Sequence, residues 1–325
     1  MRARAWVDFR LHRFELVAVW LGGAVLAVAA ILIAAQFRAV NAPADCLGRV
    51  DVHGAVALIR PACAAPVEAF ARIDMDEARR YFILPLPFAA AAGMLLGVAA
   101  MGRELERGTA PLPWTLSGRR WRWLGARAAV LLALVLAAVV PVALAADYLE
   151  GVRAPGVDAM ASFADETARG WPLAAVAVAA FAVGLAVGTL VGRQLPGLIV
   201  AAVVTGVLLT GVTVAMDHWT AVNAVAVPLD AGRWGDRSFE AMFQSRADGR
   251  LLPYPEATAL QPPRPDLPPG TVDDAWLQQN FTEVLLLVPG SRYPEAVALR
   301  SAMLLGSAGV FLVLALVVVE RRRPA

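Results

Sequence analysis

The chain has 325 residues, of which 59% are hydrophobic and only 17% charged, and its formal net charge is +2. Its mean hydropathy of +0.61 is too high for an ordinary soluble protein, and the near-neutral charge gives no indication of nucleic-acid binding. All 29 basic residues are arginine. Because a P-loop ATPase needs the Walker lysine, the chain cannot be such an enzyme by itself.

The N-terminal residues 1–13 alternate arginines with apolar side chains, including Trp6. This pattern predicts an amphipathic helix in the membrane interface, with a simple basic flank as the alternative. The apolar run Phe14–Ala35 that follows is long enough to span a bilayer. Residues 40–42 faintly resemble a signal-peptide cleavage site, but the apolar run is longer than a usual signal h-region, so we expect a retained membrane helix.

Five further apolar runs have the length of membrane-spanning helices. They are Phe82–Met101, Ala126–Ala146, Pro172–Val191, Gly197–Met216 and Ala296–Val319. The predicted fold is therefore an all-α integral membrane protein with six transmembrane helices, five in residues 14–216 and the sixth in residues 296–325 with a basic tail. Gly184 and Gly188 form a G-xxx-G pair, which permits close helix packing but arises easily by chance in a run so rich in small residues.

Three longer segments connect these runs. Residues 36–81 and the acidic residues 147–171 are expected to be loops. The third segment, 217–295, is hydrophilic, and its proline-rich middle, Leu251–Gly270, is expected to be irregular or extended. Ala275–Val288 is expected to be helical.

The arginines are distributed unevenly between the two sides of the predicted bundle. If both termini are cytoplasmic, the cytoplasmic segments and their margins hold fourteen of the 29 arginines but only five of the 27 acidic residues. An arginine excess in short loops marks the cytoplasmic side. The sequence therefore predicts both termini inside, and it places segment 217–295 between helices 5 and 6 outside.

The two cysteines, Cys46 and Cys63, then share an extracytoplasmic loop. Oxidation is permitted there, so a disulfide is possible, although spacing alone leaves free thiols equally open. The three histidines are isolated and no His/Cys cluster has metal-ligand spacing, so we expect no metal site.

The loop 102–125 between helices 2 and 3 combines arginines, two glutamates and tryptophans. In the simplest interpretation it only anchors the bundle at the membrane interface through three tryptophans and two arginines. These are Trp114, Trp121 and Trp123 together with Arg119 and Arg120. That interpretation leaves the two glutamates unexplained. Arg103–Glu106 and Glu104–Arg107 are spaced for ion pairs on a short helix that could face another protein, with Gly108-Thr109 ending it.

These residues carry a family resemblance. The pattern Glu104-x-Glu106-x-Gly108-Thr109, with Trp114–Ser117 and Arg119–Trp121 after it, resembles the cytoplasmic loop of ABC-2-type ABC transporter permeases, especially those of high-GC Gram-positive bacteria. The six spans, the basic N-terminus, the large segment before the last span and the run Pro289–Pro294 are also similar. The proline-rich outer segment has no match in that pattern.

The resemblance implies the permease subunit of an ATP-driven exporter in the bacterial cytoplasmic membrane, paired with a second copy or a homologous permease. A separate ATPase subunit would bind ATP and Mg²⁺, and this chain would hold no cofactor. The resemblance assigns ATPase coupling to the loop from residue 103 to about residue 116, and the residues expected to make the contact are Arg103, Glu104, Glu106, Arg107, Gly108 and Thr109.

Two other classes of function stay open at this level. A membrane-anchored receptor or immunity protein would use its outer segments to bind a ligand and its helices as a scaffold. An enzyme using the acidic residues of segment 217–295 would need a catalytic motif that we do not find. The apolar runs hold almost no ionisable side chains, which disfavours a proton-driven antiporter.

Overall fold

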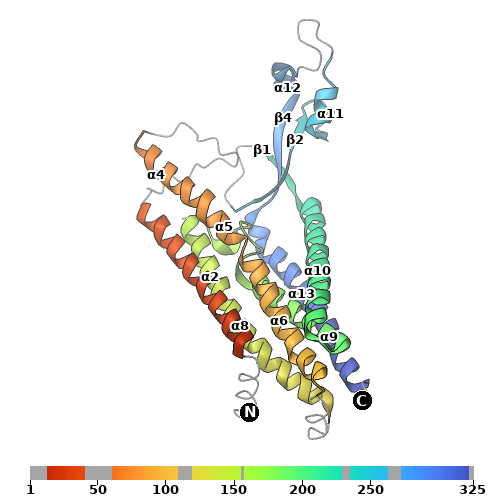
Figure 1. Ribbon diagram of the computed structural model, residues 1–325. Helices are drawn as coiled ribbons and strands as arrows, with labels where there is room; N and C mark the ends of the chain where they lie inside the picture. Colours follow the sequence, from red (N-terminus) through yellow and green to blue (C-terminus); the bar gives the residue numbers. More distant parts are fainter. Residues whose placement is uncertain are drawn as a thin grey trace.

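The structure is a computed structural model, and it describes residues 13–40, 61–108, 119–154, 157–228, 235–262 and 272–321. Within these residues, six helices are long and apolar enough to cross a membrane. They form a bundle with a small β-sheet projecting from one end, while α2 begins and α13 ends at the other end (Figure 1). The prediction of six membrane-length helices is confirmed, and the prediction of an all-α fold is wrong because of the sheet.

The six long helices are longer than the apolar runs that predicted them, because helical hydrogen bonding continues into the polar residues at their ends. Their bounds are α2 Arg13–Val40, α6 Pro85–Glu106, α8 Arg120–Arg153, α9 Gly170–Val191, α10 Gln194–Asn223 and α13 Tyr293–Arg321. Helix α8 therefore includes the first part of the predicted acidic loop.

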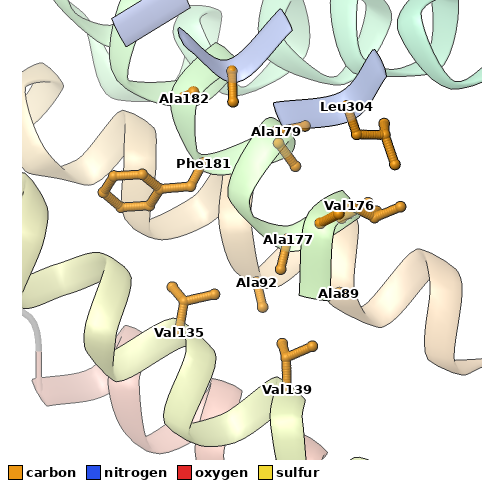
Figure 2. Close-up of a cluster of buried hydrophobic side chains, with 14 of the residues drawn as sticks. Ala89, Ala92, Val135, Val139, Val176, Ala177, Ala179, Phe181, Ala182 and Leu304 are labelled. Carbon is orange, nitrogen blue, oxygen red and sulfur yellow. The ribbon is translucent and has the colours of Figure 1, made fainter. Parts of the chain in front are cut away.

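Helix α9 lies at the centre of the bundle. It packs against α6, α8, α10 and α13, and 83% of the residues in its apolar 18-residue stretch are buried. Figure 2 shows Ala177, Ala179 and Phe181 of α9 meeting side chains of α6, α8 and α13. The many alanines of α9 follow from this position, since a helix surrounded by four neighbours has room at most positions for small side chains.

Helices α6 and α9 approach each other most closely at glycines. A Cβ added to Gly184 would stand 2.7 Å from the Met94 carbonyl oxygen, and one added to Gly188 would stand 2.8 Å from the Val98 carbonyl oxygen. Gly93 and Gly97 of α6 lie equally close to the main chain of α9. The G-xxx-G pair, which the sequence left indistinguishable from chance, is thus part of a two-sided glycine contact.

The predicted loop of residues 36–81 is wrong over its described second half. Residues 61–82 are helical: α4 spans Pro61–Ile73, a π-helical turn spans Asp74–Ala78, and α5 spans Arg79–Phe82. The charged residues that made this stretch look like a loop are mostly exposed, except for Asp74, which pairs with Arg153 of α8. On the inner face, Phe70 packs against Phe37 of α2 with ring centroids 4.7 Å apart. Tertiary packing therefore stabilises a helix that composition did not indicate.

The sheet is built between α10 and α13. Its strands are β1 Val225–Pro228, β2 Arg237–Ser245, β3 Leu251–Leu252 and β4 Phe281–Val288, in the order β1-β4-β2-β3 and all antiparallel. Short helices α11 (Tyr254–Ala259) and α12 (Asp274–Asn280) cover its far end. The predicted helix over Ala275–Val288 is correct only to Asn280, because the apolar residues after it pair with β1 and β2.

Candidate functional site

The residues assigned to coupling lie at the end of α6, at the end of the bundle opposite the sheet (Figure 1). Arg103, Glu104 and Glu106 form the last turn of α6, and Arg107 and Gly108 follow it as a turn with Gly108 at φ +68°. The expected separate short helix is therefore wrong for these residues. Gly102 is the one poor helix former between Met101 and Glu106, and no proline follows it there, so the spanning helix continues through these residues. Four predicted site residues lie outside the described residues: Trp6, Cys46, Thr109 and Trp114.

Two ion pairs and a hydrogen bond join the end of α6 to three other helices. Arg103 pairs with Glu15 of α2, and its Nε donates to the side-chain oxygen of Gln194 in α10 at 3.4 Å. Glu104 pairs with Arg127 of α8, whose side chain is buried. The spacing of these charges predicted pairs within one short helix. Their actual partners are distant along the chain, and spacing gives no indication of them.

Glu106 and Arg107 are exposed, in contrast to Arg103 and Glu104. One carboxylate oxygen of Glu106 accepts a 3.0 Å hydrogen bond from the Gln194 amide, the first residue of α10. This is a favourable place for a carboxylate, since the first amides of a helix have no intrahelical acceptor. The remaining exposed surface of Glu106, Arg107 and Gly108 is open to a partner.

The arginines and tryptophans at the start of α8 have different surroundings. Arg119 precedes the helix and is exposed, Arg120 is half-buried, and Trp121 is 41% exposed. Trp123 is half-buried, with the Arg127 guanidinium 5.3 Å from its ring centroid. Trp121 thus has the exposure of an interfacial anchor, whereas Trp123 packs against the ion pair of Arg127 and Glu104.

A second cluster of charges lies at the sheet end, and the sequence analysis missed it. Arg169, just before α9, is completely buried. It donates to the carbonyl oxygens of Ala159, Ser162 and Ala164 at 3.0, 2.5 and 2.8 Å, and to the carboxylate of Asp147 at 3.1 Å. Its guanidinium therefore holds the connection between α8 and α9 in one shape.

Glu166 in the same connection is also buried, and its Oε1 accepts from two arginines. These are Arg237 of β2 at 2.5 Å and Arg300 of α13 at 3.0 Å. Arg237 also pairs with Asp217 of α10 at 2.9 Å. One signal could have indicated this cluster: Arg300 is a charge within an apolar run, and such a residue needs a partner.

Arg153 at the end of α8 joins the helices of residues 61–82 to this region. It pairs with Asp74 in the π-helical turn, with Asp165 at 2.5 Å and with Glu150 at 3.3 Å. In α4, which precedes this π-helical turn, Cys63 is buried and disulfide-bonded. Its predicted partner Cys46 lies outside the described residues.

The far end of the sheet holds a half-open pocket of about 720 Å³. Phe243, Tyr254 and Phe281 contribute aromatic walls, and Arg246 and Glu283 contribute charge. In the part of the chain that the structure describes, no three His, Cys, Asp or Glu side chains gather in a way that could hold a metal ion.

Comparison with known proteins identifies the family. The family described as "ABC-2 membrane transporter related" matches residues 16–220, which is well over half of the chain and includes α2 to α10 and the end of α6. No curated protein and no solved structure matches the chain. The chain therefore belongs to the ABC-2 membrane transporter related family, and it is a multi-pass membrane protein with six candidate spanning helices.

Proposed function

We propose that the chain is the permease subunit of an ATP-driven ABC-2-type exporter in a bacterial cytoplasmic membrane. The observation that carries this proposal is the family match over residues 16–220. ATP and Mg²⁺ would bind to a separate ATPase subunit, because a chain without lysine lacks the Walker lysine. A second copy of the chain, or a homologous permease, would complete the pathway. Both termini would lie in the cytoplasm and the sheet outside, as the arginine distribution indicates.

The coupling surface would be the turn after α6, centred on the exposed Glu106 and Arg107. Three contacts support this assignment. Arg103 pairs with Glu15, Glu104 pairs with Arg127, and Glu106 binds the Gln194 amide, so the end of α6 is joined to α2, α8 and α10. A force applied to this turn would therefore reach four helices at once. A bundle with two discrete packings could convert that force into opening and closing.

The test is co-purification of the full chain in detergent with the proteins of its own cell, followed by mass spectrometry. An ATPase with a Walker motif should co-purify with the unchanged chain. The double variant E106R/R107E reverses both exposed charges, and it should reduce the recovered ATPase about tenfold, which corresponds to ~1.4 kcal/mol of binding.

The matched control is E68R/R72E, which reverses an exposed i,i+4 pair on α4 at the other end of the bundle. It should leave ATPase recovery unchanged. If no ATPase accompanies the unchanged chain, the proposed exporter is wrong. If the ATPase is recovered equally with E106R/R107E, the exporter stands but the coupling surface is elsewhere.

A further inference from the structure

The connection between α8 and α9 crosses the sheet end of the bundle and contacts both the sheet and α13. The Phe163 amide donates to the Gly235 carbonyl oxygen at 2.8 Å, and the Phe163 ring meets the Tyr293 ring edge-on with centroids 5.5 Å apart. Gly290 lies directly against the Ala161 carbonyl oxygen, with no room for a Cβ. Residues 157–169 therefore lie over the junction where the sheet continues into α13.

Two buried charged residues, Arg169 and Glu166, bind this connection, and they have different partners. Arg169 binds the connection's own carbonyl oxygens and Asp147 of α8, so it fixes the internal shape of the segment. Glu166 binds Arg237 of β2 and Arg300 of α13, which belong to the sheet and to the following helix. Breaking the Glu166 contacts would remove both ion pairs between the segment and those elements and would leave the contacts inside the segment in place. The remaining contacts with the sheet and α13 include the Phe163 hydrogen bond and the ring contacts of Tyr293 with Phe163 and Arg169.

Helix α13 is apolar over most of its length, but Arg300 and Ser301 form a polar position in it next to Glu166. The Arg300 side chain is about 8% exposed and pairs with Glu166. Ser301 is buried next to it, and its hydroxyl has no hydrogen-bond partner among the residues that the structure describes. A charged guanidinium that loses its carboxylate must be hydrated, so separating Glu166 from Arg300 would draw water to this face of α13.

We propose that residues 157–169 form a gate at the sheet end of the bundle, and that Glu166 is its latch. In the closed state shown here, Glu166 joins β2 and α13 through Arg237 and Arg300. In the open state these two contacts are broken together with the weaker contacts of Phe163 and Arg169 with Gly235 and Tyr293, the connection moves away as a unit shaped by Arg169, and water reaches α13 beside Ser301. This gate rests on the proposed function for its purpose, since an export pathway needs a closure at its exit, but its opening can be measured without transport.

The experiment places a reporter cysteine at Ser301, the buried residue that follows Arg300 in α13. S301C is nearly isosteric and removes no hydrogen bond seen in the described residues. The purified protein in detergent is treated with a hydrophilic maleimide, and the labelling rate is measured by mass, with the unchanged chain as the thiol background. S301C alone should react slowly. S301C/E166Q should react about tenfold faster or more, because each ~1.4 kcal/mol lost from the closed state raises the open population tenfold.

Two further variants make the result specific. S301C/R237Q removes the sheet-side contact of Glu166, together with the exposed Arg237–Asp217 pair, and should give a smaller rise, since Arg300 keeps Glu166. S301C/E295Q weakens the exposed pair between Arg292 and Glu295 at the start of the same helix, and it should not raise the labelling rate.

The gate is wrong if E166Q leaves the labelling rate of S301C unchanged, or if E295Q raises it as much as E166Q does. If E166Q aggregates on size exclusion, R237Q decides alone, and an unchanged rate there overturns the proposal. Loss of the ATPase interaction would contradict the exporter and leave the labelling result unaffected.

Discussion

Gly184 of α9 lies so close to Met94 of α6 that a Cβ added to it would stand 2.7 Å from the Met94 carbonyl oxygen. A main-chain oxygen cannot move aside by a change of rotamer, as a side-chain atom could, so the two helices would have to separate. Gly93 and Gly97 meet α9 in the same manner from the other side. The distance between α6 and α9 is therefore set by the absence of side chains at these positions.

Replacing Gly184 with alanine should destabilise the bundle by about 1–3 kcal/mol, the usual cost of overpacking a tight contact. The measurement is the apparent melting temperature of the detergent-solubilised chain, followed by size exclusion. Gly206 of α10 is the matched control, because a Cβ there meets nothing within 4 Å. G206A should leave the melting temperature unchanged or raise it slightly, since alanine is the better helix former. Equal effects of the two changes would show that the close approach is unimportant.

Removing the Glu104 carboxylate should also destabilise the chain. Arg127 is buried, and E104A would leave its guanidinium without that partner. We expect a loss of about 3 kcal/mol, at the lower end for a broken buried pair because the Glu104 side chain is 17% exposed. The exposed pair of Glu68 and Arg72 is the comparison, and E68A should cost about 0–1 kcal/mol. Thermal unfolding of both variants checks this, and a larger effect at Glu68 would contradict it.

Exchanging Arg169 for lysine should loosen the connection between α8 and α9 although the charge is kept. The guanidinium donates to four acceptors spread around it, and a lysine ammonium has three donors at a single point. Chymotrypsin should therefore cleave after the buried Phe163 faster in R169K than in the unchanged chain. R72K, on the exposed face of α4, should have no effect. Unchanged cleavage in R169K would mean that the connection is held by its other contacts.

The disulfide of Cys63 predicts a simple thiol count. Because the sequence has two cysteines, the unchanged chain should show no reactive thiol before reduction and two after it. C63S should expose one reactive thiol at Cys46 without reduction. A thiol titration in denaturant measures all three values. Two free thiols in the unreduced chain, purified under conditions that prevent reduction, would contradict the predicted pairing.

The helices were predictable from the sequence because the length of an apolar run is a local property. The sheet was not, because Val284–Val288 is equally apolar as a helix or as a strand, and its pairing with β1 and β2 decides between them. Residues 61–82 show the opposite error. Their charges suggested a loop, but contacts with α2 and α8 stabilise a helix.

The two ends of the bundle differed in how far the sequence could identify their residues. Glu104 and Glu106 were found from a local pattern, whereas their partners Arg127 and Gln194 depend on how the helices pack. At the sheet end, Glu166 and Arg237 are 71 residues apart and carry no local pattern at all. Buried ion pairs between distant segments therefore lie beyond what spacing rules can detect, except where a lone charge such as Arg300 interrupts an apolar helix.

The sheet has a practical consequence for the helices beneath it. Strand β1 follows α10 after one residue, and β4 pairs with β1 and leads into α13. These two helices are the least buried of the six candidate spans: 17% and 22% of the residues in their apolar 18-residue stretches are buried. An antibody fragment that binds the exposed residues of β2 would therefore hold the sheet that joins α10 to α13, and it would give a rigid marker at this end of the bundle for trapping or imaging the protein.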